Sequence, residues 1–213
     1  MKENKQHVVI SKATIDRLPL YYRTLKLSQE EGVAIISSEE LGRRIGVTPE
    51  QIRKDLSAFG EFGKKGVGYY VSELIRNIGE ILGLNRQWNI AIVGVGHLGW
   101  ALANYANFAS QGFQLQAIFD VDANKVGKYI NDVEIFDCDR MPEIVAERDI
   151  QIGIITVPAE YAQSVANKLI KSGIKGIWNF TPVKIDVPER LHIVNEDLSV
   201  GLSSLSFHLS RSL

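Results

Sequence analysis

The sequence predicts an α/β protein in which a small helical domain precedes a parallel sheet with helices between its strands. Up to about residue 82, apolar residues recur at helical spacing, and glycines follow the ends of these segments. From residue 88 onward, short apolar segments of strand character alternate with helical ones. We place the domains at residues 1–84, 85–196 and 197–213, the last being a terminal helix.

The N-terminal domain contains two short helices that are joined by a tight turn. Ser37 and Glu40 form a capping box at the start of the first helix. Thr48 caps the second helix, Pro49 stands at its first position, and Gly60 supplies its end. Only two residues, one of them a glycine, separate the helices, and the second helix is basic. This arrangement predicts a helix-turn-helix.

The second helix has one apolar and one polar face. Ile52, Leu56 and Phe59 lie at i, i+4 and i+7, so they form a stripe toward a core. A β-hairpin wing is expected over residues 61–71, with lysines at its tip. The side chains expected to contact DNA are Gln51, Arg53, Lys54 and Ser57 on this helix, Arg43 and Arg44 on the preceding one, and Lys64 and Lys65 on the wing. A helical domain with a solvated basic face is the alternative, and the helix pair together with the wing favours DNA.

Composition limits the classes of protein. The 213 residues are 45% hydrophobic and 23% charged, as is ordinary for a globular protein. No apolar run approaches the roughly 18 residues of a membrane span, and the N-terminus lacks the pattern of a secretory signal. A single cysteine, Cys138, excludes an internal disulfide and a cysteine-rich zinc site. We therefore expect a cytoplasmic protein with no metal and no membrane partner. The net charge of −1 combines +3 over residues 1–88 with −4 over the rest.

The second domain begins with the pattern of a nucleotide site. A helix over residues 73–82, capped by Ser72 and ended by Gly83, leads into it. A strand at residues 88–93 then runs directly into a glycine-rich turn, and a helix is expected from residue 100 to residue 108. This order is what a dinucleotide-binding unit needs. The residues of the turn assigned to the cofactor are Gly94, Val95, Gly96, His97, Leu98 and Gly99.

Each glycine of the turn has its own expected role. Gly94 permits the tight turn, Gly96 lets the backbone approach a pyrophosphate, and Gly99 lets helix and sheet pack closely. The next strand, at residues 114–119, ends in Asp120, at about the spacing of a residue that binds the adenosine ribose. A carboxylate there accepts hydrogen bonds from the ribose hydroxyls and repels a 2′-phosphate, so NAD(H) is expected rather than NADP(H). The alternative role of Asp120 is that of a turn residue.

The remaining segments continue the alternation. A strand at residues 150–157 has the continuous apolar character of a strand that is covered on both faces. A helix over residues 161–170 and strands at residues 176–180 and 191–194 follow. The residues at the carboxyl ends of these strands that are expected to line the cofactor site are Thr156, Val157 and Pro158, with Asn179 and Phe180 on the nicotinamide side.

The last segment is an amphipathic helix outside this alternation. Leu198, Leu202, Leu205 and Leu209 recur at i, i+4, i+7 and i+11. This stripe must be covered, either by the helix's own domain or, because the helix ends the chain, by a partner subunit.

Together, these features resemble the redox-sensing transcriptional repressors called Rex. The matching residues are 51–57, 59–60, 63–69, 81–86, 93–99, 119–122, 156–158, 173–177 and 179–180, in order over nearly the whole chain. The resemblance implies a homodimer with winged-helix DNA-binding domains, Rossmann domains that bind NADH and NAD⁺, and C-terminal helices swapped between subunits. It also implies binding to a palindromic operator and release from it when NADH rises.

The resemblance carries over three positions that the pattern alone does not select. Arg23 matches an arginine that communicates with the cofactor domain, Tyr105 matches a tyrosine near the nicotinamide, and Asp197 matches an acidic residue contributed to the opposite subunit. Their other roles would be a surface cation, a core aromatic residue and a helix cap. Some relatives place an aromatic residue where this chain has Leu198.

Two other classes share the glycine turn. An NAD-dependent dehydrogenase also needs a substrate domain and a general acid or base beside the nicotinamide. The four histidines, His7, His97, His192 and His208, offer no good candidate, so we expect no enzyme. A CoA-binding module of the kind found in acyl-CoA ligases is the second alternative, and Asp120 together with the basic N-terminal domain argues against it.

Overall fold

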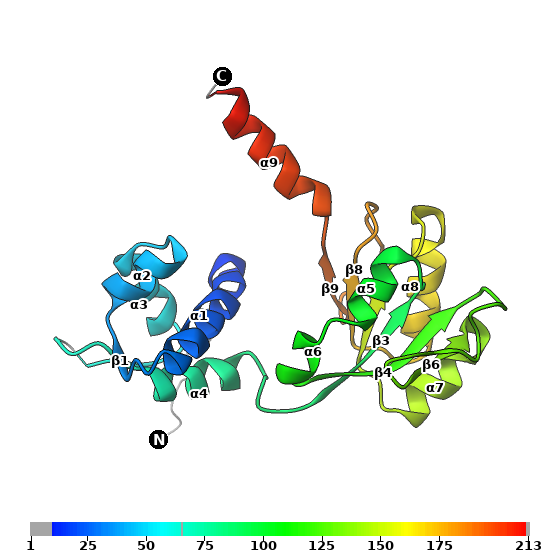
Figure 1. Ribbon diagram of the computed structural model, residues 1–213, viewed down its shortest axis with the longest axis horizontal. Coiled ribbons are helices and arrows are strands. Elements are labelled where there is room, and N and C mark those ends of the chain that lie inside the picture. The colour runs from blue at the N-terminus through cyan, green and yellow to red at the C-terminus, as the bar shows by residue number, and fades with distance from the viewer. Residues whose placement is uncertain (1–9, 65, 212–213) are drawn as a thin grey trace. The chain divides into compact units, whose positions relative to one another are not determined.

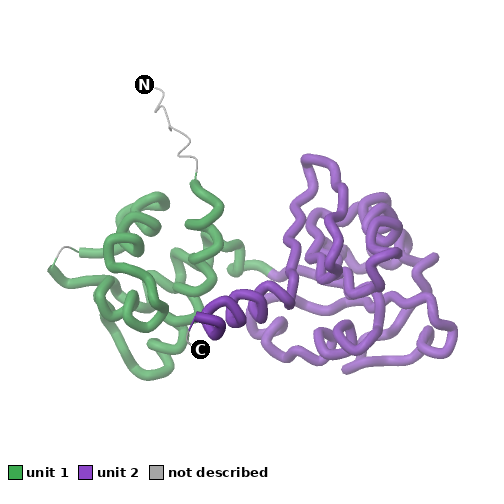
Figure 2. The backbone as a smooth tube through the Cα atoms, turned by 90° about the horizontal axis from the view of Figure 1, so that it is seen from above, with its two compact units in different colours: residues 1–86 green, residues 87–213 purple. Residues whose placement is uncertain are grey.

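The chain folds into two compact units, at Met1–Arg86 and Gln87–Leu213. Figure 1 shows the computed structural model, which describes residues 10–64 and 66–211. Figure 2 colours the first unit green and the second purple. The first unit therefore ends two residues beyond the boundary placed at residue 84, and the terminal helix counts with the second unit.

The first unit is built around its N-terminal helix. Its elements are α1 (Lys12–Glu30), β1 (Ile35–Ile36), α2 (Ser38–Ile45), α3 (Pro49–Ser57), β2 (Tyr69–Tyr70) and α4 (Val71–Ile81). Leu18, Tyr21 and Leu25 on α1 are completely buried. They belong to one core cluster with apolar residues of β1, α2, α3, β2 and α4. Ile52 and Leu56 of α3 lie in this cluster, as the stripe on that helix predicts.

The helix-turn-helix prediction is confirmed at its caps. The Ser37 hydroxyl accepts a hydrogen bond from the Glu40 N–H at 3.1 Å, and Thr48 accepts one from the Gln51 N–H at 3.3 Å. Gly46 ends α2 at a φ of 73°, a conformation that favours glycine. The second helix ends earlier than expected, because α3 stops at Ser57 and the chain turns before Gly60 is reached.

The wing differs from the predicted hairpin. Lys64 and Gly68 form only an isolated antiparallel bridge, and the β2 strand pairs instead with β1, with Ile35 opposite Tyr70. The β1 strand is two residues long, too short for its pattern to be recognised in the sequence. The helix after the wing starts at Val71 rather than after Ser72, so Ser72 is not its cap. Lys65 lies outside the described residues.

The second unit holds a seven-stranded sheet. Its strands are β3 (Trp88–Val93), β4 (Phe113–Asp120), β5 (Tyr129–Ile130), β6 (Val133–Asp137), β7 (Ile152–Ile155), β8 (Gly176–Asn179) and β9 (His192–Asn195). Their order is β5-β6-β4-β3-β7-β8-β9, and every neighbouring pair from β6 to β9 is parallel. The chain moves from β3 to one side and then returns to place β7 on the other side. Such a switch point opens a crevice at the carboxyl ends of the strands.

Helices cover both faces of this sheet. They are α5 (His97–Ala103), α6 (Asn107–Ser110), α7 (Met141–Glu147) and α8 (Ala162–Lys171), with short 3₁₀ turns η1 (Cys138–Arg140) and η2 (Ala159–Tyr161). Ala91 and Val93 of β3 pack in a cluster with residues of α7 and α8, whereas Ile90 and Ile92 pack with residues of α5 and α6. Adjacent residues of one strand face opposite sides, so both faces of β3 are buried.

The helix expected from residue 100 to residue 108 is divided in two. The α5 helix begins earlier, at His97, and ends at Ala103, and α6 begins only at Asn107. The Asn104 side chain donates to the Trp100 carbonyl oxygen at 2.8 Å, which satisfies an acceptor at the end of α5. Tyr105 therefore lies in the connection between two helices.

The terminal helix α9 (Leu198–Ser210) is exposed along its whole length. Its apolar side chains include Leu202, which is 71% exposed, and Phe207, which is 52% exposed. The described part of its own chain therefore leaves the apolar stripe uncovered. No helix among the described residues combines the length and hydropathy that crossing a bilayer requires.

Candidate functional site

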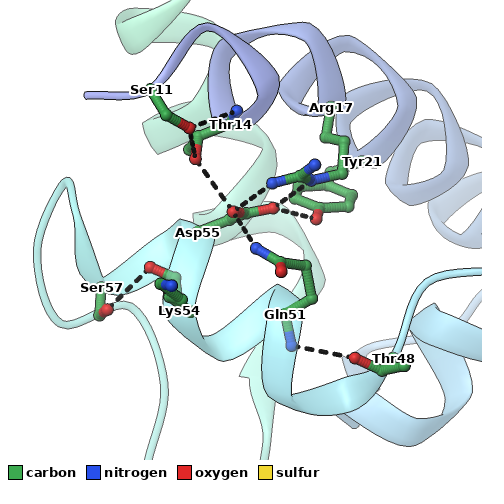
Figure 3. A network of polar contacts seen from close by, with 9 residues as sticks. All are labelled: Ser11, Thr14, Arg17, Tyr21, Thr48, Gln51, Lys54, Asp55 and Ser57. Carbon is green, nitrogen blue, oxygen red and sulfur yellow. Dashed lines mark hydrogen bonds and ion pairs between the residues drawn. The ribbon is translucent and has the colours of Figure 1, made fainter.

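A buried carboxylate connects α3 to α1. Asp55 is 1% exposed, and Figure 3 shows donors converging on it from both helices. Arg17 binds it through two nitrogens, with Nε 2.6 Å from Oδ2 and Nη2 2.8 Å from Oδ1. The Tyr21 hydroxyl donates to Oδ2 at 2.6 Å, and Thr14 Oγ1 and Gln51 Nε2 donate to Oδ1 at 3.1 and 2.8 Å. Charge-assisted, bidentate contacts of this kind are the strongest hydrogen bonds in proteins.

This network determines protonation states. Burial alone raises the pKa of Asp55, but hydrogen bonds from Arg17, Tyr21, Gln51 and Thr14 outweigh it and lower the pKa to about 2. The carboxylate is therefore ionised and can only accept hydrogen bonds, so the Gln51 amide must turn its nitrogen toward Asp55. Gln51 is one of the residues expected to contact DNA, and Asp55 fixes its orientation.

The arginines expected to contact DNA lie on the surface in ion pairs. Arg53 donates to Ser38 Oγ at 2.6 Å and to Glu50 Oε1 at 2.9 Å. Arg44 lies 2.7 Å from Glu31 and 2.8 Å from Glu40, and Arg43 also pairs with Glu40. Because exposed ion pairs contribute little free energy, each arginine can exchange its carboxylate for a phosphate or a base.

Two of the basic residues, Arg53 and Lys64, line a hollow between α3 and the wing. This cavity has a volume of about 720 Å³, and its lining includes Arg53, Ser57 and Lys64. The Lys64 ammonium lies 5.6 Å from the centre of the Tyr70 ring. Lys54 is exposed on α3 and has no ion-pair partner among the described residues. Arg43, Arg44, Gln51 and Lys54 lie outside the lining of the hollow.

A second cavity, of about 800 Å³, lies in the other unit at the carboxyl ends of β3, β4 and β7. It brings together seven residues that the sequence assigned to a cofactor: Gly94, Val95, Gly96, Asp120, Thr156, Val157 and Pro158. The other six assigned residues are outside its lining: His97, Leu98, Gly99, Tyr105, Asn179 and Phe180. The cavity size falls in the range of small-molecule sites, about 300–1,000 Å³.

The three glycines meet different surroundings. Gly94 has a φ of +95°, and a side-chain carbon on it would lie 2.7 Å from Val157 Cγ1. On Gly99 such a carbon would lie 2.0 Å from the Gly94 carbonyl oxygen, so only glycine allows α5 to approach the turn. On Gly96 it would meet no atom within 4 Å. Packing within the chain therefore requires the first and third glycines, whereas Gly96 faces open space that a ligand can occupy.

Asp120 is already extensively bonded. Its Oδ2 accepts from the Val95 N–H at 2.7 Å and from Lys125 Nζ at 3.1 Å, and its Oδ1 accepts from the Asp122 N–H at 2.9 Å. Burial alone raises the pKa of Asp120, but the two backbone N–H groups and Lys125 lower it. Three of about four acceptor positions are thus used. A ribose that offers two hydroxyls must displace one donor, and Lys125 is the donor on a flexible side chain.

Several other residues support or line this cavity. The Thr156 hydroxyl donates to the Gly94 carbonyl oxygen at 2.7 Å, so it holds the glycine turn in place. Cys138 lines the cavity, and burial raises its pKa to about 11, which keeps it a thiol at neutral pH. The residues of the lining that sequence patterns did not select as site residues include Lys125, Cys138, Met141, Tyr161 and Lys168. They follow other strands or belong to helices, and only the fold brings them to the turn.

Aromatic rings gather on the opposite face of the sheet. The Trp178 and Phe180 rings are 4.5 Å apart, Phe108 lies 6.2 Å from Trp178, and Tyr105 lies 5.0 Å from Phe108. Tyr105 is 51% exposed, and its hydroxyl accepts from Asn107 Nδ2 at 3.2 Å. Two of the residues expected near a nicotinamide, Tyr105 and Phe180, thus belong to one aromatic cluster.

Two residues assigned to switching are at the surface. Arg23 is exposed on α1. Asp197 caps α9 by accepting from the Ser199 N–H at 2.8 Å, and the hydroxyl and N–H of Ser199 lower its pKa. Within residues 10–64 and 66–211, no cluster of three or more His, Cys, Asp or Glu side chains is arranged to hold a metal ion.

Two protein families match parts of the chain. Residues 9–57 match the family described as putative DNA-binding protein N-terminus. Residues 85–183 match the family described as CoA binding domain. The first match includes α1, α2 and α3, and the second spans the sheet from β3 to β8.

Similar proteins extend over nearly the whole chain. A protein of Syntrophobacter fumaroxidans named redox-sensing transcriptional repressor Rex is 52% identical over 94% of this chain and 96% of its own length. A Rex-family repressor, RSP, solved with β-NAD⁺ and operator DNA has a TM-score of 0.90 and 43% identity, and covers 96% of this chain and 94% of its own. A structure of RSP with β-NADH has a TM-score of 0.88 and 41% identity, with 96% of each chain covered.

Proposed function

The chain belongs to the Rex family of redox-sensing transcriptional repressors, and we propose that it binds a palindromic operator and leaves it when NADH binds. The observation that carries this proposal is the combination, in one chain, of a basic helix-turn-helix with a dinucleotide cavity. A DNA-binding domain alone would indicate any transcription factor, and a glycine turn alone would indicate any nucleotide-binding protein. Their union indicates that the nucleotide regulates DNA binding.

The ligands are NADH and NAD⁺. The open space at Gly96 admits a pyrophosphate, and Asp120 stands where a ribose hydroxyl would exchange with Lys125. Gly94 and Gly99 shape the turn, and Val95, His97 and Leu98 contribute its backbone. Thr156, Val157 and Pro158 form the facing wall. RSP was solved with both redox forms of this cofactor.

The nicotinamide ring is the part that distinguishes the two forms. The ring of NAD⁺ carries a positive charge that NADH lacks, and removing a charge from water without a partner is costly. The cluster that includes Tyr105 and Phe180 consists of aromatic rings. A nicotinamide against this cluster therefore favours the neutral, reduced cofactor.

The DNA-binding face is formed by α3, α2 and the wing. We assign base contacts in the major groove to Arg53 and Lys54, supported by Gln51 and Ser57. Arg43 and Arg44, which lie on α2, contact phosphates, as do Lys64 and Lys65 on the wing. Two such faces in a dimer must reach half-sites roughly 34 to 36 Å apart, one turn of the duplex.

The proposed dimer uses the terminal helix. The apolar stripe of α9 is left uncovered by its own chain, and a partner subunit that exchanges α9 would bury it. In this arrangement Asp197 belongs to the partner's cofactor region, and Arg23 and Tyr105 complete the switch. We place the protein in the cytoplasm, because its proposed function requires contact with both DNA and NADH.

We propose no catalytic reaction. Of the two histidines in the second unit outside α9, His97 lies at the start of α5 and His192 lies on the edge strand β9, and neither lines the cavity. A CoA ligand is the second candidate, since residues 85–183 match a CoA-binding family. Calorimetry with NADH, NADPH and CoA separates these ligands, and tighter binding of CoA than of NADH would refute the cofactor assignment.

A gel-shift titration tests the regulation. The full chain is titrated against a palindromic duplex and a scrambled duplex at fixed salt, with NADH or NAD⁺ added separately. We expect tight binding to the palindrome alone, and weaker binding when NADH is present. Equal affinity for both duplexes would refute sequence-specific DNA binding.

A further inference from the structure

We propose that Asn179 is a positioning residue that transmits the state of the nicotinamide site to the strand that leads into α9. This inference rests on the proposed function and names the route by which the same site is regulated. Three observations carry it: the complete use of the Asn179 polar atoms, its position beside Phe180, and its bonds to the last residues before α9.

Asn179 is fully buried, and its side chain is saturated with hydrogen bonds. Its Oδ1 accepts from the Thr181 N–H at 2.9 Å and from the Thr181 hydroxyl at 2.7 Å. Its Nδ2 donates to the Val183 carbonyl oxygen and to Asn195 Oδ1, each at 2.9 Å. An amide offers about four hydrogen-bonding positions, and all four are occupied within the chain. The polar atoms of the Asn179 side chain thus have no position left for a hydrogen bond to the cofactor.

Three of the four side-chain bonds shape the turn beyond β8. They connect Asn179 to Thr181 and Val183, so the turn that begins at Phe180 is closed onto the end of the strand. The Phe180 N–H donates to the Ile155 carbonyl oxygen at 3.0 Å, and its ring packs 4.5 Å from Trp178. A nicotinamide that contacts the Phe180 ring therefore acts on a turn that Asn179 holds together.

The fourth side-chain bond, together with a backbone bond at the Asn179 carbonyl oxygen, reaches the end of the strand before α9. Asn195 is the last residue of β9, Glu196 donates its N–H to the Asn179 carbonyl oxygen at 2.8 Å, and Asp197 is the cap of α9. In the described sheet, β9 is an edge strand whose only neighbour is β8. The Asn179–Asn195 bond therefore adds a side-chain connection to the backbone ladder at the point where the chain leaves the sheet.

A change in the turn at Phe180 consequently reaches the start of α9 through Asn179. In the proposed dimer α9 is held by the partner subunit, so a shift of its first residues changes the relation between the two subunits. Such coupling requires a structural element that has two arrangements and whose equilibrium depends on both sites. In this proposal the element is the Asn179–Asn195 contact, which lies between the nicotinamide site and the start of α9.

Substitutions of Asn195 test this route without touching the cofactor region. Asn195 is exposed, so its replacement leaves the core intact. Asn195→Ala removes the acceptor for Asn179 Nδ2. Asn195→Asp replaces the amide oxygen with a carboxylate oxygen that can accept the same hydrogen bond. Asn167→Ala is the matched control, because Asn167 is also exposed and also bonded to another amide, Gln163, at 3.0 Å on α8.

Two quantities are measured on the full-length dimer of each variant. NADH affinity is measured by calorimetry without DNA, and operator affinity is measured by fluorescence anisotropy with and without saturating NADH. We expect Asn195→Ala to bind NADH, and to bind operator without NADH, as the wild type does. The factor by which NADH weakens its operator binding should be about fivefold smaller than in the wild type. That factor corresponds to one neutral hydrogen bond of about 1 kcal/mol. We expect Asn195→Asp and Asn167→Ala to respond as the wild type does.

Three outcomes would overturn the proposal. The first is an Asn195→Ala variant with the full wild-type response to NADH. The second is an Asn195→Asp variant that loses the response as Asn195→Ala does, since its acceptor is retained. The third is loss of NADH binding itself in Asn195→Ala, which would make the residue part of the binding site. A wild-type protein whose operator affinity ignores NADH would instead refute the proposed function, and the route with it.

Discussion

Replacing Asp55 by asparagine removes one charge from the centre of the first unit without changing side-chain volume. Arg17 then loses its counter-ion, and the new amide group turns a donor toward groups that are themselves donors. Breaking a buried ion pair by removing one partner costs about 3–5 kcal/mol. The lowering of the Asp55 pKa from 3.8 to about 2 corresponds to about 2 kcal/mol. We therefore expect the first unit to lose about 3 kcal/mol of unfolding free energy.

The distribution of tryptophan makes this loss measurable in the full chain. The three tryptophans, Trp88, Trp100 and Trp178, all lie in the second unit, whereas helices of both units contribute to far-UV circular dichroism. In a urea titration of Asp55→Asn, an early transition should appear in circular dichroism, and the tryptophan fluorescence transition should stay where it is in the wild type. DNA binding should weaken in parallel, because Asp55 holds α3 on α1.

Asp16→Asn is the matched control for this experiment. Asp16 is exposed on the same helix that carries Arg17, so the variant makes the same chemical change away from the network. We expect its urea transitions to match those of the wild type. The reasoning would be refuted if Asp55→Asn unfolded as the wild type does, or if its tryptophan transition shifted as much as its circular dichroism.

Acid should reproduce the effect of the substitution. The pKa of Asp55 is lowered in the folded state, so its stabilising contribution is complete above the unfolded value of 3.8 and is lost as pH falls toward about 2. The difference in unfolding free energy between the wild type and Asp55→Asn should therefore decrease as the pH falls from 3.8 toward about 2. A difference between the two proteins that stayed constant from pH 6 to pH 2 would contradict the assignment.

The remaining predictions concern the two binding regions. Gly96→Ala should weaken NADH binding at least about tenfold in calorimetry and leave the melting temperature unchanged. The reason is that a Cβ there meets no atom of the protein within 4 Å but would meet a pyrophosphate. An NADH affinity equal to that of the wild type would contradict this prediction. Asp120→Ala should also weaken NADH binding, and unchanged affinity would exclude a ribose contact. Lys64→Ala should weaken operator and scrambled DNA alike and reduce the salt slope by about 1, because its proposed contact is to phosphate. Arg53→Ala should cost about 1–3 kcal/mol on operator and relax the preference at one base pair, and an equal loss on all sequences would show that it binds phosphate only.

Local patterns predicted the parts of the fold that depend on neighbours in the sequence. The caps at Ser37 and Thr48 form because a hydroxyl reaches an N–H three residues on, whatever the rest of the chain does. The strand at residues 88–93 was predicted with the bounds that the structure shows, because the apolar run over residues 90–93 is followed at once by Gly94. The glycine turn joins it to α5 as expected.

The parts that failed depend on contacts between distant residues. The strand β2 was expected to pair within the wing, but it pairs with Ile35 and Ile36, more than thirty residues earlier in the chain. No element was predicted for residues 12–30, where α1 lies; it carries Pro19 inside it, a residue that disfavours a helix when it is judged locally. Its core residues nevertheless make it the centre of the first unit.

The candidate sites follow the same division. Gly94, Gly96 and Asp120 were selected by spacing, and they do line one cavity. The Asp55 network was not predicted, because Arg17 and Asp55 are 38 residues apart and neither stands in a recognisable motif for this role. Asn179 was selected for its position at a strand end, and no sequence pattern predicted the four hydrogen bonds by which its side chain holds Thr181, Val183 and Asn195.

The most direct test of the central claim is operator affinity as a function of the ratio of NADH to NAD⁺ at constant total cofactor and constant salt. If reduced cofactor controls DNA binding, the dissociation constant should rise steadily as NADH replaces NAD⁺, and Gly96→Ala should flatten the curve. A dissociation constant that stays the same from fully oxidised to fully reduced cofactor would contradict the account.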